Sequence, residues 1–184
     1  QASEFTDAAR ILMLSSVPEH AAYLKKNHKR NHNFITMQME GLARLGLGFP
    51  EFAEAKMKVK IAKEILTEEI AGQTYPDGAQ KELTAGYHLV ALSRFQNVAD
   101  DLIKAGDFVS IQYKQTLEKM WSYSAYSLRP DGGIPLNNDS DIKDISNRLL
   151  TKAEEYNRPD WSYIATNGEA GKQPQGLATK VFPW

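Results

Sequence analysis

Tyr87 and His88 lie side by side at the end of the stretch YPDGAQKELTAGYH (residues 75–88), shortly after a Pro-Asp-Gly turn. A phenol and an imidazole are both groups that move protons in enzymes. If a helix begins near Lys81 or Glu82, the pair lies in its first two turns, at one rim of a helical domain. Tyr87 also heads an apolar stripe with helical spacing, formed by Ala91, Phe95, Val98 and Leu102. Taken alone, this stretch favours a core tyrosine with its hydroxyl at the surface over a catalytic one.

A second group of chemically capable residues is the stretch YLKKNHKRNHNF (residues 23–34). It interleaves cations with amides and imidazoles: Lys25, Lys26, Asn27, His28, Lys29, Arg30, Asn31, His32 and Asn33. Such a run fits the solvated C-terminus of a helix, where cations interact favourably with the dipole. It also fits an anion-binding rim, because Arg and Lys bind carboxylates and sulfates through charge-assisted hydrogen bonds. The i, i+4 spacing of the two histidines suits metal ligands, but no HExxH glutamate and no third ligand accompany them, so we predict no metal site.

Several carboxylates could in principle form the acid/base pair of a glycoside hydrolase, among them Asp77, Glu82 and Asp131. Asp77 and Asp131 each follow a proline and precede a glycine, so both are explained as turn residues. The acidic run NNDSD (residues 137–141) lacks the glycine and the distal glutamate of a calcium loop. We expect it instead to cap the next helix through Asp139 or Ser140.

The elements that must position these residues are helices. Apolar residues recur at helical spacing in three stretches besides that of Tyr87: Ile35, Met39 and Leu42; then Phe52, Ala55, Val59, Ala62 and Leu66; and Leu117, Met120 and Trp121 within a helix expected over 109–127. Residues 5–27 are expected to form a further helix, disturbed at Pro18. The second helix should end near Gly46 and Gly48, and the third should start at the Phe49-Pro50-Glu51 segment.

The turn sequence Pro-Asp-Gly occurs twice, at 76–78 and at 130–132, each time between helical segments. This arrangement predicts repeated antiparallel helical hairpins. The pattern loosens after about Asp139, and residues 165–184 read as an extended polar tail. No run has the features of a β-strand. We therefore predict an all-α protein, with residues 1–184 forming a single helical domain.

Composition excludes several classes of function. The 184 residues are 42% hydrophobic and 24% charged with a net charge of −1, whereas a dedicated nucleic-acid binder would be strongly basic. No apolar run approaches the roughly 18 residues that a membrane span needs, and cysteine is absent. No phosphate-binding glycine loop, Ser/His/Asp signature or dinucleotide fingerprint is present, and no cofactor is predicted. The N-terminal stretch has no signal-peptide pattern, which leaves export undecided.

Three segments taken together resemble the heparinase II/III-like polysaccharide lyases, a group that includes heparin/heparan sulfate lyases and alginate lyases. The segments are NFITMQMEGLARLGLGFPEF (33–52), YPDGAQKELTAGYH (75–88) and RPDGGIPLNNDSD (129–141). Their order and spacing hold over most of the chain. The resemblance implies an incomplete α/α toroid of antiparallel helical hairpins. It also implies that residues 165–184 lead toward a missing C-terminal β-sandwich domain that supplies a further catalytic histidine. The chain is then expected to be part of a longer, periplasmic or secreted enzyme, and inactive alone.

The resemblance also implies roles for residues. Asn33 matches the asparagine that neutralises the uronate carboxylate, and Tyr87 matches the tyrosine that acts as acid toward the leaving glycosidic oxygen. His88 matches the adjacent histidine, expected to neutralise or orient the uronate, and Glu82 a glutamate with a supporting hydrogen bond. Many relatives have His or Trp after the asparagine, where this chain has Phe34. Asn31, followed by His32, is therefore kept as a reserve for Asn33.

The function that the resemblance implies is β-elimination on an acidic, uronate-containing polysaccharide. The basic residues Lys29 and Arg30 are expected to bind the substrate together with Asn31, His32 and Glu82. The basic run from Lys25 to Arg30 slightly favours a heparan sulfate-like glycan over alginate. Two alternatives remain open: a glycoside hydrolase on the same toroid, and a non-catalytic carbohydrate-binding module. No nucleic acid and no membrane is expected as a partner.

Overall fold

The protein is described by a computed structural model that covers residues 5–175. Seven helices form in this range: α1 (Asp7–Asn27), α2 (Asn33–Gly48), α3 (Ala55–Gly72), α4 (Ala85–Lys104), α5 (Ile111–Tyr126), α6 (Ser146–Glu155) and α7 (Pro159–Ala165). Between residues 5 and 175 there is no strand, only two isolated β-bridges. The all-α prediction is confirmed. No helix in this part of the chain is long and apolar enough to cross a membrane.

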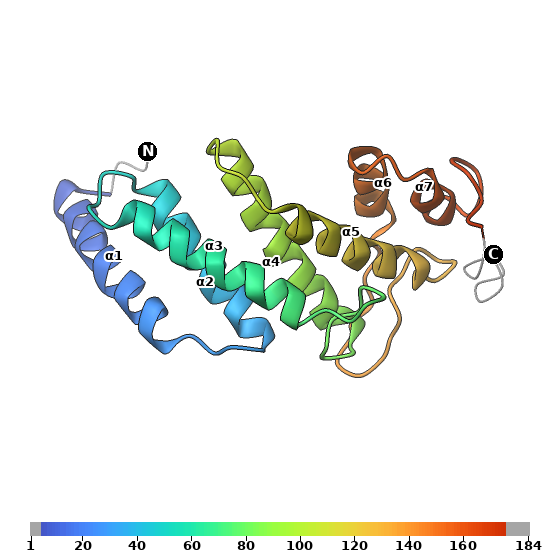
Figure 1. Ribbon diagram of the computed structural model, residues 1–184, viewed down its shortest axis with the longest axis horizontal. Helices are drawn as coiled ribbons and strands as arrows, with labels where there is room; N and C mark the ends of the chain where they lie inside the picture. The colour runs from blue at the N-terminus through green and yellow to red at the C-terminus, as the bar shows by residue number, and fades with distance from the viewer. Residues whose placement is uncertain (1–4, 176–184) are drawn as a thin grey trace.

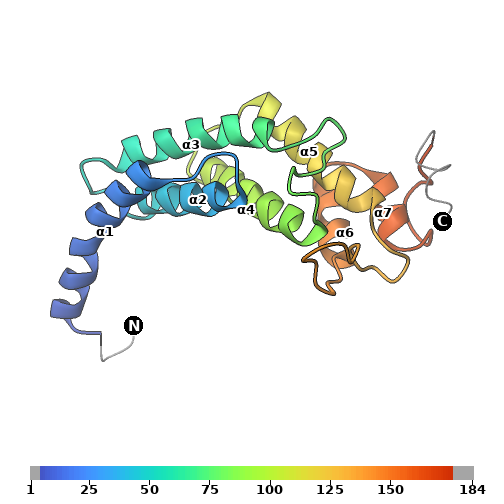
Figure 2. The same cartoon turned by 90° about the horizontal axis from the view of Figure 1, so that it is seen from below.

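The helices α1 to α5 reverse direction one after another (Figure 1), and α3 and α5 lie on one side of α2 and α4 (Figure 2). The helix α3 packs closely against α2, and α2 in turn packs against α4. The chain reverses direction between α2 and α3 and again between α3 and α4. The helices α2 and α4 therefore run parallel, and both begin at the lower edge of the molecule in Figure 1. This topology brings Asn33, at the start of α2, to the same rim as Tyr87, near the start of α4.

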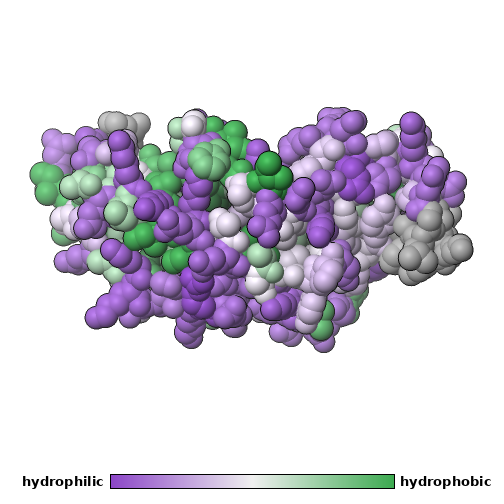
Figure 3. Space-filling view, in the orientation of Figure 1, coloured by the Kyte–Doolittle hydropathy of each residue, from purple (hydrophilic) through white to green (hydrophobic). Residues whose placement is uncertain are grey.

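The core is built from the stripes that the sequence indicates. Ile35, Met39, Phe95, Met120 and Trp121 are all fully buried. Burying such side chains contributes roughly 1.5–3 kcal/mol each, which is what holds the helices together. In the view of Figure 3, hydrophobic surface gathers over the α1–α4 half, whereas the α5–α7 half is mostly hydrophilic.

Two helices begin later than the sequence predicts. The third helix starts at Ala55 rather than near Glu51, because Phe52 and Ala55 donate backbone hydrogen bonds in tight turns to Phe49 and Phe52. The helix α4 starts at Ala85 rather than at Lys81 or Glu82. Leu83 lies in the left-handed region at φ 53°, and a helix cannot include such a residue.

Three further expectations are corrected. The helix α1 continues through Pro18, with Val17 and Ala21 buried on either side. Asp139 and Ser140 do not cap the next helix, because α6 begins only at Ser146 and Ser140 binds the start of α4 instead. The helix α7 was not expected. The predicted tail begins at its last residue, Ala165; residues 166–175 form no helix, and residues 176–184 lie outside the described range.

The two Pro-Asp-Gly turns have the same geometry. Asp77 Oδ1 accepts from the N–H of Ala79, and Asp131 Oδ1 accepts from the N–H of Gly133, both at 3.0 Å. Each turn is closed by the same backbone hydrogen bond: the N–H of Tyr75 donates to the Ala79 carbonyl, and the N–H of Arg129 donates to the Gly133 carbonyl, both at 2.8 Å. The predicted repeat of helix, turn and helix is therefore confirmed, and both aspartates are turn residues.

Candidate active site

Asn33 is the first residue of α2, and Glu82 holds it by two hydrogen bonds. The Asn33 backbone N–H donates to Glu82 Oε1 at 2.9 Å, and its side-chain Nδ2 donates to Glu82 Oε2 at 3.2 Å. Asn33 is 2% exposed. A carboxylate bound in this way caps the helix and fixes the amide in one orientation. An amide nitrogen carries two hydrogens, so one remains to donate to a ligand.

Tyr87 and His88 lie in the first turn of α4 but differ in their exposure to solvent. Tyr87 is 36% exposed, and its hydroxyl has no hydrogen-bond partner within residues 5–175. His88 is 3% exposed. The tyrosine is therefore not the core residue that the apolar stripe suggests, and its histidine neighbour takes the buried position.

The His88 ring is fully engaged inside the protein. The N–H of Gln80 donates to Nδ1 at 3.2 Å, which puts the ring proton on Nε2. Nε2 lies 3.1 Å from the Met120 carbonyl oxygen and 3.0 Å from Ser124 Oγ, both on α5. Burial lowers the pKa of His88 to about 4, partly offset by the Met120 hydrogen bond. The neutral ring thus ties the turn before α4 to α5, and it does not reach the surface.

Two glutamines, Gln73 and Gln80, connect the start of α2 with the start of α4. Gln80 Oε1 accepts from the N–H of Glu82 at 2.8 Å, and Gln80 Nε2 donates to Gln73 Oε1 at 3.3 Å. Gln73 Nε2 donates to Glu69 Oε2 at 2.7 Å and to the His32 carbonyl at 3.2 Å. Both glutamines are at most 2% exposed. Sequence reasoning did not identify these glutamines. The available signal was that they flank the Pro76-Asp77-Gly78 turn.

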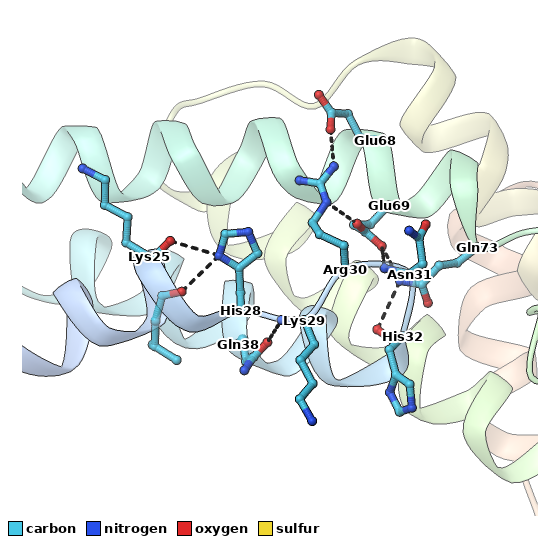
Figure 4. Close-up of polar contacts among 11 residues, drawn as sticks. Lys25, His28, Lys29, Arg30, Asn31, His32, Gln38, Glu68, Glu69 and Gln73 are labelled. Atoms are coloured by element: carbon cyan, nitrogen blue, oxygen red, sulfur yellow. Dashed lines mark hydrogen bonds and ion pairs between the residues drawn. The ribbon is translucent and has the colours of Figure 1, made fainter.

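The basic stretch before α2 binds the C-terminal part of α3 (Figure 4). Arg30 Nε pairs with Glu69 Oε1 at 2.7 Å, and the guanidinium also pairs with Glu68. The N–H of Asn31 donates to Glu69 Oε2 at 3.0 Å, with Asn31 in the left-handed region at φ 58°. Arg30 and Asn31, both expected to bind substrate, are thus engaged by α3, and of the two asparagines only Asn33 is bound by Glu82.

Lys29 and His32 remain exposed at the same rim. The Lys29 ammonium lies 6.0 Å from the centroid of the Phe34 ring and makes no ion pair in the described range. The His32 ring lies 4.6 Å from the Phe34 ring, and its Nδ1 lies 3.0 Å from Asn33 Oδ1. His28 turns away from His32, with Nδ1 near the Leu24 and Lys25 carbonyls (Figure 4).

A cavity of about 230 Å³ lies beside Tyr87. Its walls come from the first turns of α4 and from the segment that precedes α6: Gly86, Tyr87, Val90, Ile134, Asp139, Asp141 and Lys143. The exposed phenol therefore adjoins a hollow lined by both positive and negative side chains. An arrangement of this kind can supply a phenolic proton and an oriented amide donor to a bound polar ligand.

Comparison with known proteins finds heparin-sulfate lyases among the relatives of this chain. The chain is 29% identical to a heparin-sulfate lyase of Bacteroides stercoris and 28% identical to one of Pedobacter heparinus, in each case over 95% of this chain. The chain spans about 27% of the length of these two relatives.

Solved structures give the same result. A heparinase III structure superimposes with a TM-score of 0.74 at 28% identity, covering 95% of this chain and 28% of that one. The heparan sulfate lyase of Pedobacter heparinus gives 0.70 at 27% identity, covering 96% and 29%. A further heparinase III, at 22% identity, gives 0.85 and supports the fold alone. The predicted part of an α/α toroid, built from antiparallel hairpins, is confirmed. The family model described as "Heparinase II/III N-terminus" matches residues 1–160, and the chain belongs to this family.

Proposed function

We propose that this chain supplies the helical part of the active site of a polysaccharide lyase that cleaves a heparan sulfate-type glycan by β-elimination. The observation that carries the proposal is the pairing of an oriented amide with an exposed phenol at one rim. Asn33 is fixed by Glu82, and Tyr87 projects from the neighbouring parallel helix. The names of the curated relatives, heparin-sulfate lyases, support the same class of substrate.

The chemistry requires charge neutralisation and a proton donor. The proton at C5 of a uronate becomes acidic enough to remove only when the carboxylate charge is neutralised. In our proposal the free Nδ2 hydrogen of Asn33 donates to that carboxylate. A base removes the C5 proton, the C4–O bond breaks, and a C4=C5 double bond forms. The Tyr87 hydroxyl gives its proton to the departing oxygen. For some substrate stereochemistries the same tyrosine also serves as the base: it then starts as the phenolate, takes the C5 proton and passes that proton to the departing oxygen.

The other residues act through these two. Glu82 orients Asn33, and His88 fixes the backbone that carries Tyr87, so both are positioning residues in the proposal. Lys29 and His32, which remain exposed, are assigned to the acidic glycan, whereas Arg30 is assigned to holding the loop before α2 on Glu69. Glu82 does not suit the acid/base role of a glycoside hydrolase, since both its oxygens accept from Asn33.

The test is a product analysis with the full-length protein on heparan sulfate, alginate and a neutral glucan. We expect heparan sulfate to give new chain ends that absorb in the near ultraviolet, because the product is conjugated. New reducing ends without that absorbance would instead identify a hydrolase. Binding of heparan sulfate without any product would identify a non-catalytic module, and absorbing products from alginate alone would overturn the choice of substrate. Location outside the cytoplasm and a following β-sandwich domain stay predictions from the resemblance.

A further inference from the structure

The first turn of α4 is capped by residues more than fifty positions away. Thr84 stands at the N-cap position, but its side chain makes no capping hydrogen bond. Instead, the N–H of Ala85 donates to Asn137 Oδ1 at 3.2 Å, and the N–H of Gly86 donates to Ser140 Oγ at 2.9 Å. The free N–H groups at the start of a helix are commonly satisfied by the residue just before it. Here the capping groups come from the segment that leads to α6.

The same segment also holds the residue before the cap. Leu83 is a non-glycine residue in the left-handed region, which is an unfavourable conformation that surrounding contacts must maintain. Its carbonyl oxygen accepts from Asn137 Nδ2 at 2.8 Å and from Asn138 Nδ2 at 3.1 Å. Asn137 therefore bridges both sides of the turn, since its oxygen binds the helix N–H and its nitrogen binds the carbonyl before it.

Close packing makes this contact specific. A Cβ at Gly86 would lie 3.3 Å from both the Asp139 carbonyl oxygen and Ser140 Cα, so the backbones nearly touch. The Thr84 and Ser140 hydroxyl oxygens lie 3.0 Å apart. The four residues preceding Tyr87 are thus all in contact with residues 137–140.

Tyr87 depends on this backbone because its own hydroxyl is bound to nothing in the described range. The phenol is therefore placed by the backbone that carries it and not by a hydrogen bond of its own. The cavity beside Tyr87 is also walled by Asp139, so the capping segment and the cavity share residues. We propose that Asn137 and Ser140 are positioning residues for Tyr87, aligning the proposed acid through the start of α4. The proposal rests on the function assigned to Tyr87 above.

The variants Asn137→Ala and Ser140→Ala test this in the full-length protein, with Asn147→Ala, an exposed position on α6, as the matched control. We expect kcat on heparan sulfate to fall about tenfold or more in each variant, since small displacements of a reacting group have large effects on rate. KM should stay within about twofold, because uniform binding is untouched. The conservative variant Ser140→Thr keeps the acceptor oxygen and should retain most of kcat. Asn137→Asp keeps the acceptor for the Ala85 N–H but loses the donor to the Leu83 carbonyl, so it should retain less.

A double-mutant cycle distinguishes the proposed positioning role of Asn137 from a purely structural one. If Asn137 acts through Tyr87, then adding Asn137→Ala to Tyr87→Phe should not lower the residual rate further. An equal loss of kcat in both backgrounds would overturn the proposal, as would unchanged kcat in both alanine variants. If Asn137→Ala gives too little folded protein, the cycle is measured with Ser140→Ala, which removes only one hydroxyl. Full activity of Tyr87→Phe would instead overturn the proposed function itself.

Discussion

The Glu82 carboxylate accepts from both the backbone N–H and the side-chain amide of Asn33, at 2.9 and 3.2 Å, although the two residues are separated by 49 positions. One carboxylate therefore caps α2 and orients the group proposed to meet the substrate. The contact also links the loop before α4 to the start of α2. The geometry of the amide and the position of Tyr87 are consequently parts of one connected network.

Replacing Glu82 by Gln tests that link. The substituted amide keeps the size of the side chain but presents only one acceptor oxygen, so one of the two Asn33 donors loses its partner. We expect unfolding to become easier by about 1–3 kcal/mol and kcat to fall by about 10²-fold. Chemical denaturation and initial rates measure the two effects. Glu68→Gln is the control, since this glutamate is 68% exposed and lies outside the link; equal effects at both positions would contradict the role of Glu82.

Glu69 should matter more for stability than its neighbour Glu68. Its side chain is 2% exposed and accepts from Arg30, Asn31 and Gln73. Among residues 5–175, Glu68 binds only the partly exposed Arg30. We expect Glu69→Gln to cost about 1–3 kcal/mol, and Glu68→Gln less than about 1 kcal/mol because exposed pairs are screened by solvent. Urea denaturation of both variants measures the difference. A cost for Glu68→Gln that matches or exceeds that of Glu69→Gln would show that the network is misassigned.

His88 predicts a pH dependence of folding. Its pKa falls from the ordinary 6.5 to about 4 because the ring is buried. Between these values the unfolded chain binds a proton that the folded protein does not, so stability is full above about pH 6.5 and declines as the pH falls toward 4. The loss is on the order of 3 kcal/mol. Denaturation at a series of pH values measures it, and His88→Asn should flatten the curve in this window. An unchanged slope in that variant would assign the effect to other groups.

Gly78 should resist substitution more than Gly106. Both have positive φ, 97° and 76°, which disfavours any side chain. A Cβ at Gly78 would also lie 2.1 Å from the Lys119 carbonyl oxygen on α5, whereas nothing lies within 4 Å of one at Gly106. We expect Gly106→Ala to cost about 1 kcal/mol and Gly78→Ala at least twice as much. Thermal unfolding of the two variants compares them. Equal costs would indicate that the turn does not pack on α5 as described.

The helices were predictable because burial on one face leaves a periodic pattern. Met39, Ala62, Phe95 and Met120, one from each stripe, are all buried as expected. Tyr87 shows where periodicity fails, since it continues such a stripe and yet is exposed. Its exposed position depends on the turn at Leu83 and on contacts from residues 137–140, which no local pattern encodes.

The candidate site was predictable only in part for a similar reason. Asn33, Tyr87 and Glu82 were found through a resemblance that preserves order and spacing. Gln73 and Gln80 were not found, because a buried polar residue is identified by its partners, and those partners come from distant segments. The helix α7 was missed because its seven residues are too few to show a period.

The proposed role of Tyr87 as the acid is tested by the rate at which the full-length Tyr87→Phe variant forms ultraviolet-absorbing product from heparan sulfate. The substitution removes one hydroxyl and leaves the packing of α4 intact. Tyr75→Phe, an exposed tyrosine in the preceding turn, is the matched control. We predict that Tyr87→Phe loses at least about 10²-fold in kcat, with an unchanged unfolding midpoint, while Tyr75→Phe keeps its rate. Undiminished product from Tyr87→Phe would contradict this role.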